Sequence, residues 1–181
     1  METERDFAAE FPAEAFSEEG YLIDQGKLRR IAYGRYTSDY NGCGWIAAYN
    51  LLHLCGIKMQ PSDVCRMLAR GLRLGGKFGT FPLFLRKYLR RYLPVQLRIR
   101  TKKQFCHAHG DRGIILYWTG KGAHNVGFCS EQDGGGNIRF LNAVYGKKNY
   151  LLTAEAFWKK HVHFPLCLVF EVKQLEKKQQ V

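Results

Sequence analysis

The stretch Asp39-Tyr40-Asn41-Gly42-Cys43-Gly44-Trp45-Ile46-Ala47-Ala48 decides how this chain is interpreted, because a loop becomes a helix at a cysteine. Turn-forming residues precede it, and apolar residues then recur at helical spacing, which predicts a buried helix over Gly44–Leu54. At its N-terminal end, the helix dipole and free N–H groups favour a thiolate and can bind an oxyanion. Cys43 is therefore the candidate nucleophile. The alternative is a small core residue, which is our interpretation of Cys55, Cys65, Cys129 and Cys167.

A nucleophilic thiol needs a base, and the base needs a group that orients it. A hairpin is predicted from strands at His124–Glu131 and Asn137–Val144 around the glycine-rich turn at 133–136. With the turn centred near residue 134, cross-strand partners sum to about 268, so His124 and Asn142 are diagonal neighbours on one sheet face. The carboxamide oxygen of Asn142 is then expected to accept the Nδ1–H of His124. The other histidines are interpreted as structural or surface residues, with His107 and His109 in a loop.

The residue pattern in the rest of the chain predicts helices first and strands afterwards. A second helix is expected from Ser62 to Gly71, and a third from an N-cap at Thr80 to Pro94, with a glycine-rich loop between them. The apolar period then changes to two, which predicts strands at 95–100, 113–119 and 165–172, with one short helix at 153–161. Helices followed by an antiparallel sheet predict an α+β fold in two layers.

This order resembles the papain-like cysteine peptidase superfamily, with a helical lobe whose nucleophile lies at a helix N-terminus packed on an antiparallel sheet. The nearest pattern is that of the bacterial peptidases that remove leader peptides from exported bacteriocins. The residues that carry the resemblance are Cys43-Gly44-Trp45-Ile46-Ala47-Ala48 and His124-Asn125-Val126-Gly127-Phe128, within residues 35 to 172. The third residue in that group is usually Asp, and here Asn142 in Phe140-Leu141-Asn142-Ala143 takes its place, as in papain.

The resemblance implies a Cys43–His124–Asn142 triad that cleaves a peptide or amide bond through an acyl-enzyme, without metal or cofactor. Deamidation and acyl transfer would use the same groups. The family carries Gln six residues before the nucleophile as an oxyanion donor, but Thr37 occupies that position here. Asn41 is the alternative side-chain donor, beside the backbone N–H of Cys43. Thr37 also favours an alternative function, in which a weak or inactive papain-like fold is a basic binding module for an acidic protein or nucleic acid.

The charge of the chain is unevenly distributed. The net charge is +12 from 28 basic and 16 acidic side chains, yet residues 1–24 hold eight acidic and one basic, a sum of −7. Residues 25–181 therefore hold 27 basic and 8 acidic side chains, a sum of +19. We predict an acidic N-terminal arm (1–24), a hydrolase domain (25–173) and a polar tail (174–181). The arm is either a solvated tail or a segment that folds back on the body through Phe7, Phe11, Phe16 and Tyr21.

Several classes of protein and site are disfavoured. The apolar runs are too short to span a bilayer, and no export signal is visible in residues 1–24, so a cytoplasmic protein with reduced thiols is expected. Cys106-His107-Ala108-His109 lacks a second pair of metal ligands. Gly71–Lys77 matches the start of a phosphate-binding loop, but Phe78 stands where Ser or Thr should hold Mg²⁺. The basic stretch 86–103 has no motif that reads nucleic-acid bases, so a peptide or protein partner is preferred over nucleic acid. The positive charge of the chain favours an acidic partner.

Overall fold

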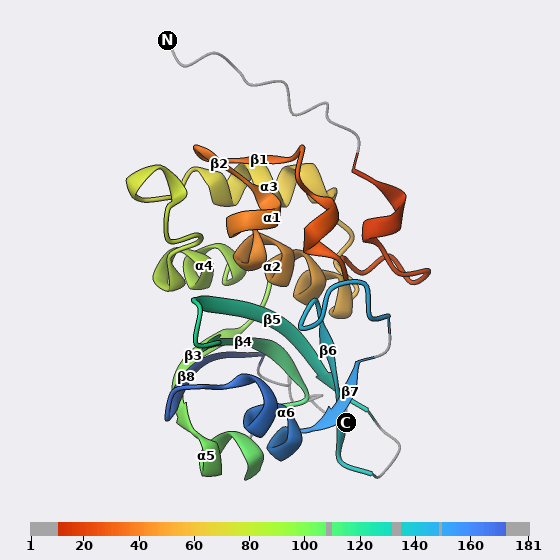
Figure 1. Cartoon of the computed structure of the whole chain (residues 1–181), viewed down its shortest axis with the longest axis vertical. Coiled ribbons are helices and arrows are strands. Elements are labelled where there is room, and N and C mark those ends of the chain that lie inside the picture. The colour runs from red at the N-terminus through yellow and green to blue at the C-terminus, as the bar shows by residue number, and fades with distance from the viewer. Residues whose placement is uncertain (1–10, 108–109, 132–134, 149, 173–181) are drawn as a thin grey trace, which may run out of the picture.

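The computed structural model describes residues 11–107, 110–131, 135–148 and 150–172. A helical lobe packs on an antiparallel sheet of six strands, which gives the α+β fold that the sequence predicts (Figure 1). The helices are α1 (Ser38–Asn41), α2 (Cys43–Leu54), α3 (Pro61–Ala69), α4 (Pro82–Leu89), α5 (Lys102–His107) and α6 (Ala154–His161). The large sheet contains β3 (Val95–Thr101), β4 (Arg112–Trp118), β5 (Ala123–Ser130), β6 (Asn137–Leu141), β7 (Leu151–Thr153) and β8 (Leu166–Val172). A small hairpin, β1 (Ala32–Tyr33) and β2 (Tyr36–Thr37), precedes α1.

The helix α2 is the centre of the helical lobe and confirms the predicted helix. Its residues from Cys43 to Leu52 are buried on all sides, as expected for a helix that is apolar all round. The predicted cap of the third helix is wrong. The helix α4 begins at Pro82 after Phe81, because proline suits the first helical position, while the Thr80 hydroxyl lies 2.6 Å from Tyr33 Oη.

The register of the predicted hairpin is confirmed. Gly127 lies opposite Leu141 and Phe128 opposite Phe140, so partner numbers sum to 268 as expected. The strand order in the sheet is β3-β8-β4-β5-β6-β7, and all pairs are antiparallel. The last strand, β8, is therefore inserted between β3 and β4.

The prediction of two layers is wrong, because both faces of the sheet are covered. The helix α2 packs on β4 and β5 from one side, and α5 and α6 lie on the other side, at the bottom of Figure 1. On that side the ring of Phe157 in α6 stacks on Phe140 of β6, with centroids 3.8 Å apart. The aromatic ring of Phe105 in α5 joins the same core beside Trp158. The helices α5 and α6 thus form a second hydrophobic core with this face of the sheet.

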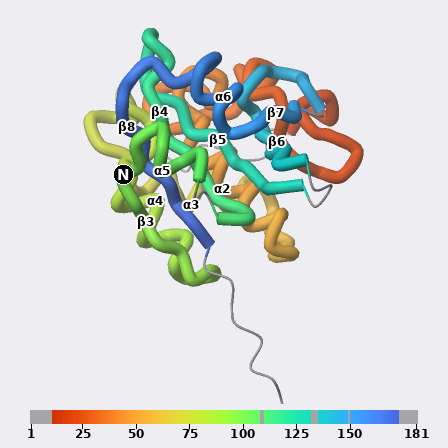
Figure 2. The backbone as a smooth tube through the Cα atoms, turned by 90° about the horizontal axis from the view of Figure 1, so that it is seen from below, coloured from red at the N-terminus to blue at the C-terminus, as the bar shows by residue number. Residues whose placement is uncertain are grey.

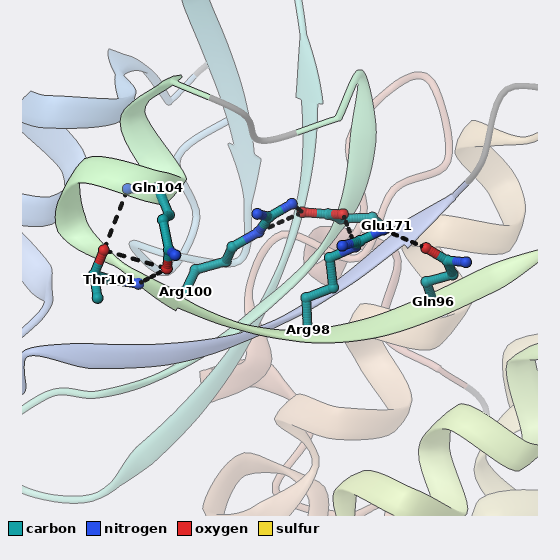
Figure 3. Close-up of polar contacts among 6 residues, drawn as sticks. All are labelled: Gln96, Arg98, Arg100, Thr101, Gln104 and Glu171. Carbon is teal, nitrogen blue, oxygen red and sulfur yellow. Dashed lines mark hydrogen bonds and ion pairs between the residues drawn. The ribbon is translucent and has the colours of Figure 1, made fainter.

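The helix α5 was not predicted, although a capping box marks its start (Figure 3). Gln104 N donates to Thr101 Oγ1 at 3.3 Å, and Thr101 N donates to Gln104 Oε1 at 2.9 Å. His107 ends this helix, so its placement in a loop is wrong, and His109 lies outside the described residues. Beside the cap, Arg98 and Arg100 of the edge strand β3 both bind Glu171 of β8, at 3.2 and 2.7 Å.

The described part of the N-terminal arm packs against α2. The ring of Phe11 meets Trp45 edge-on at 5.9 Å between centroids, and Asn50 pairs with both backbone groups of Leu22 at 2.8 Å. Residues 11–24 therefore belong to the folded body, whereas Phe7 lies outside the described residues. Within the described ranges, no helix is both long and apolar enough to cross a membrane.

Candidate active site

The structure places Cys43 as the first residue of α2, immediately after the short helix α1 and Gly42. The two flanking glycines permit this sharp junction. A Cβ atom on Gly42 would overlap the carbonyl of Ser38, and one on Gly44 would overlap the side chain of Thr80. The first N–H groups of a helix have no partner within it, so they face the region of the thiol.

The side chains of Cys43 and His124 line the same cleft, and each shifts the pKa of the other. Burial of the thiol opposes its ionisation, but the hydrogen bond and charge of His124, helped by Asn125, outweigh burial and lower the pKa of Cys43. Burial likewise favours a neutral imidazole, yet the contacts with Cys43 and with the backbone of Asn142 raise the pKa of His124. The two shifts favour a thiolate paired with an imidazolium, the form from which a cysteine attacks a carbonyl.

The structure places Asn142 beside His124, but the group that contacts the imidazole differs from the prediction. His124 Nε2 lies 3.0 Å from the backbone carbonyl oxygen of Asn142, so the nitrogen left for the thiol is Nδ1. The carboxamide of Asn142 binds Gln25 instead: its Oδ1 accepts from Gln25 N at 3.0 Å, and its Nδ2 donates to Gln25 Oε1 at 3.1 Å. Asn142 has a left-handed backbone, with φ 67°, at the point where β6 has ended. This conformation cannot be inferred from strand register.

Asn125 is a site residue that the sequence analysis did not single out. Its Nδ2 lies 3.6 Å from Cys43 Sγ, and the side chain is 4% exposed. Side chains alternate along β5, so Asn125 shares the face of Gly127, which lies against Ala47 and Asn50 of α2. The amide is therefore a buried donor aimed at the thiolate from the sheet. Its position next to His124 is the one signal that was available in the sequence.

The two predicted side-chain oxyanion donors do not reach the site. Asn41 uses its amide hydrogens on the carbonyl oxygens of Tyr33 and Gly76, at 3.2 and 2.7 Å. The Thr37 hydroxyl binds the carboxylate of Asp39. Neither residue lines the cleft at Cys43. Their polar groups instead hold the loop that carries the nucleophile.

Gln25 is a second site residue missed from the sequence. It lines the cleft with Cys43 and His124, and it is 2% exposed. Its Nε2 donates one hydrogen bond to the backbone carbonyl of Asp39 at 3.0 Å, which leaves the second N–H of the amide for another acceptor. The residue lies far upstream of Cys43 in the sequence, at the 3₁₀ turn Gln25–Lys27, so no spacing rule indicated it.

The cleft has a volume of about 620 Å³. Small residues form part of its lining beside the catalytic candidates, namely Gly122, Ala123 and Ala143. Two exposed aromatic side chains, Tyr40 and Tyr145, also line it. Lys121 contributes a cation, and none of the lining residues carries a carboxylate. An extended chain with acidic side chains is compatible with such a surface.

The six cysteines, all within the described residues, differ sharply in their environment. Burial raises the pKa of Cys65 and of Cys167 to about 12. Burial also raises the pKa of Cys55, Cys106 and Cys129. Cys43 alone has a lowered pKa. All six thiols are free, and across the described residues no three His, Cys, Asp or Glu side chains are grouped to hold a metal ion.

Comparison with known proteins identifies no family. No family profile matches the chain, and no curated protein matches it. Among solved structures, the fold is similar to a double glycine motif protease from an AMS/PCAT transporter, determined in complex with the leader peptide. The TM-score is 0.49 with 16% sequence identity, over 72% of this chain and 84% of that chain. A likeness at this level assigns neither family nor activity, so any function for the site must be argued from the contacts of Cys43 itself.

Proposed function

We propose that the protein is a cysteine hydrolase that cleaves a peptide or amide bond through an acyl-enzyme. The observation that supports this most directly is the pair of Cys43 and His124 in one cleft, where the pKa of the thiol is lowered and that of the imidazole is raised. Structural cysteines have no need of such a partner, and the other five have raised pKa values. The papain-like pattern of the sequence supports the same proposal.

In the first half of the reaction, Cys43 Sγ attacks the substrate carbonyl carbon, and the electron pair of the C=O bond moves to the oxygen. The backbone N–H at the start of α2 and the free N–H of Gln25 are the proposed donors to this oxyanion. When the tetrahedral intermediate collapses, the C–N bond breaks and His124 gives its proton to the leaving amine. The product is a thioester on Cys43.

In the second half, water attacks the thioester while His124 takes one of its protons. The C–S bond then breaks, the acid product is released, and the thiolate–imidazolium pair of Cys43 and His124 is restored. The imidazole must keep one orientation through both halves, and the backbone carbonyl of Asn142 accepts from Nε2 for this purpose. The Gln25–Asn142 amide pair holds that carbonyl in place.

We propose a peptide or protein substrate with acidic side chains near the cleaved bond. The cleft holds Lys121 and no lining carboxylate, and the body of the chain is strongly basic. Electrostatic attraction would raise the rate of encounter with such a substrate more than its final affinity. Six free thiols also fit a reducing compartment, so we place the protein in the cytoplasm as part of this proposal.

The test is the rate of alkylation of each cysteine by iodoacetamide as a function of pH, read by mass spectrometry of the peptides. At pH 6, Cys43 should react faster than Cys106 and Cys129, which are also partly accessible, and His124→Ala should abolish this advantage. Phe164→Ala is the matched control, because Phe164 is exposed and does not line the cleft. Equal reactivity of Cys43 and the other thiols at pH 6 would refute the enzyme proposal.

A basic binding module remains a second candidate, because residues 64–110 contain twelve Lys and Arg and no Asp or Glu. The variant Cys43→Ala separates the two functions. It should lose all hydrolase activity while its charged surface stays unchanged. Persistence of the biological effect in this variant would support the binding module and contradict the hydrolase.

A further inference from the structure

The connection between α3 and α4 exposes an unusual number of large apolar side chains. Leu74 is 75% exposed, Phe78 76%, Phe81 40% and Leu83 57%, all within ten consecutive residues. We call these four residues the apolar tip. The connection projects from the helical lobe in two perpendicular views, at the upper left of Figure 1 and at the left of Figure 2. Large apolar side chains exposed together in one loop are typical of an interaction site.

Hydrogen bonds to neighbouring segments fix the backbone of the apolar tip, and its side chains stay exposed to solvent. Gly75 O accepts from Arg35 N at 2.8 Å, and Gly76 O accepts from the side chain of Asn41 at 2.7 Å. Leu74 itself has a left-handed backbone, with φ 50°. A non-glycine residue in this region is uncommon and persists where the surrounding contacts impose it. The exposure is therefore a property of the folded loop rather than of a loose segment.

Cations accompany the apolar tip. The guanidinium of Arg73 lies over the ring of Phe81 at 4.9 Å, and the ammonium of Lys77 lies 5.9 Å from the centre of the Phe78 ring. The apolar tip thus carries two cations beside its aromatic rings. Such a surface is complementary to one that has anionic groups outside and apolar groups beneath them.

We propose that the apolar tip docks on the surface of an anionic lipid membrane. Leu74 and Phe78 would insert between headgroups, while Arg73 and Lys77 would contact lipid phosphates. An anionic bilayer matches this combination of apolar side chains and cations, because its phosphates lie outside its apolar acyl chains. Aromatic side chains are also enriched at the membrane–water interface. This docking is independent of the chemistry of Cys43.

The test is sedimentation of the full chain with sucrose-loaded vesicles of phosphatidylcholine, with or without 30% phosphatidylglycerol, at low and high salt. Partitioning should require the anionic lipid and should weaken as salt rises. Arg73→Gln should weaken it about fivefold, since each cation near the surface contributes about 1 kcal/mol. Phe78→Ser should weaken it at least about tenfold, from the apolar area removed from the membrane.

Phe164→Ser is the control, because Phe164 is 53% exposed but lies at the other end of the chain, after α6. This variant should partition as the unmodified chain does. Three results would each overturn the proposal: no partitioning into anionic vesicles at low salt, partitioning that Phe78→Ser leaves unchanged, or self-association without lipid that Phe78→Ser abolishes. The last would identify a second copy of the chain as the occupant. Preferential binding of an acidic peptide that competes with vesicles would overturn it in favour of a protein partner.

Discussion

Replacing Asn142 by glycine tests which group orients His124. The change removes the carboxamide but keeps the backbone carbonyl and suits the left-handed conformation at this position. It deletes both hydrogen bonds to Gln25 and leaves one buried N–H and one buried carbonyl unpaired. Each of the two unpaired groups costs about 1–3 kcal/mol, and relief of the strained φ offsets about 1 kcal/mol, so we expect a net loss of about 1–5 kcal/mol. For a chain of this size the melting temperature should fall by about 2–20 °C.

The reactivity of Cys43 should nevertheless survive in Asn142→Gly. His124 Nε2 would still have its carbonyl acceptor, so alkylation of Cys43 at pH 6, measured below the melting transition, should stay within about threefold of the unmodified chain. His124→Ala provides the reference for complete loss of the pair. If Asn142→Gly slows alkylation as much as His124→Ala does, the backbone carbonyl alone does not keep the ring oriented, and our assignment of that role to the backbone is refuted.

Three further predictions concern Asn125, Cys43 and the capping box of α5. Asn125→Ala should slow alkylation of Cys43 at pH 6 about tenfold or more, since a hydrogen bond to a charged group contributes about 1.5–3 kcal/mol, and unchanged kinetics would show that this amide does not stabilise the thiolate. Cys43→Ala should lower the pKa of His124, followed by NMR of the imidazole, because burial then lacks its largest opposing contacts; a pKa that stays raised would contradict the pairing. The lowered pKa of Cys43 contributes to the free energy of unfolding. This contribution is complete above the ordinary pKa of a thiol, and it is lost as the pH falls through the lowered pKa of the folded chain. That pH dependence should disappear in thermal melts of Cys43→Ala. Gln104→Ala should destabilise the fold by about 1 kcal/mol through loss of the α5 capping box, and a melting temperature equal to that of Lys103→Ala would show that the box contributes nothing.

The sequence predicts the structure correctly where a local pattern of residues is compatible with only one backbone conformation. Helical spacing after Cys43 predicts α2, and the glycine-rich turn limits the register of β5 and β6 to two neighbouring alternatives, of which the structure has the one with a partner sum of 268. His124 is predicted because the hairpin register and the period of two place it on the same sheet face as Asn142. The Thr101–Gln104 capping box is an equally local pattern, and it indicates the start of α5.

The missed parts of the site depend on contacts between distant segments. Gln25 reaches the cleft because the arm packs on α2, and nothing in its own sequence neighbourhood indicates that path. The backbone of Asn142 turns away from the strand after β6, so register could place the residue but not its carbonyl. Asn41 was assigned as an oxyanion donor from proximity in sequence, whereas tertiary contacts use both of its amide hydrogens.

The position of β8 between β3 and β4 has a consequence for synthesis of the chain. The ribosome adds residues in order, so β3 has no neighbour in the sheet until residues 166–172 have emerged. Until then its arginines lack Glu171, and its exposed edge is open to other unfinished chains. The helical lobe and the β4–β6 meander can form earlier, but closure of the sheet must wait for the last strand. A nascent chain stalled before Leu166 should therefore remain sensitive to protease at β3 while α2 is already protected.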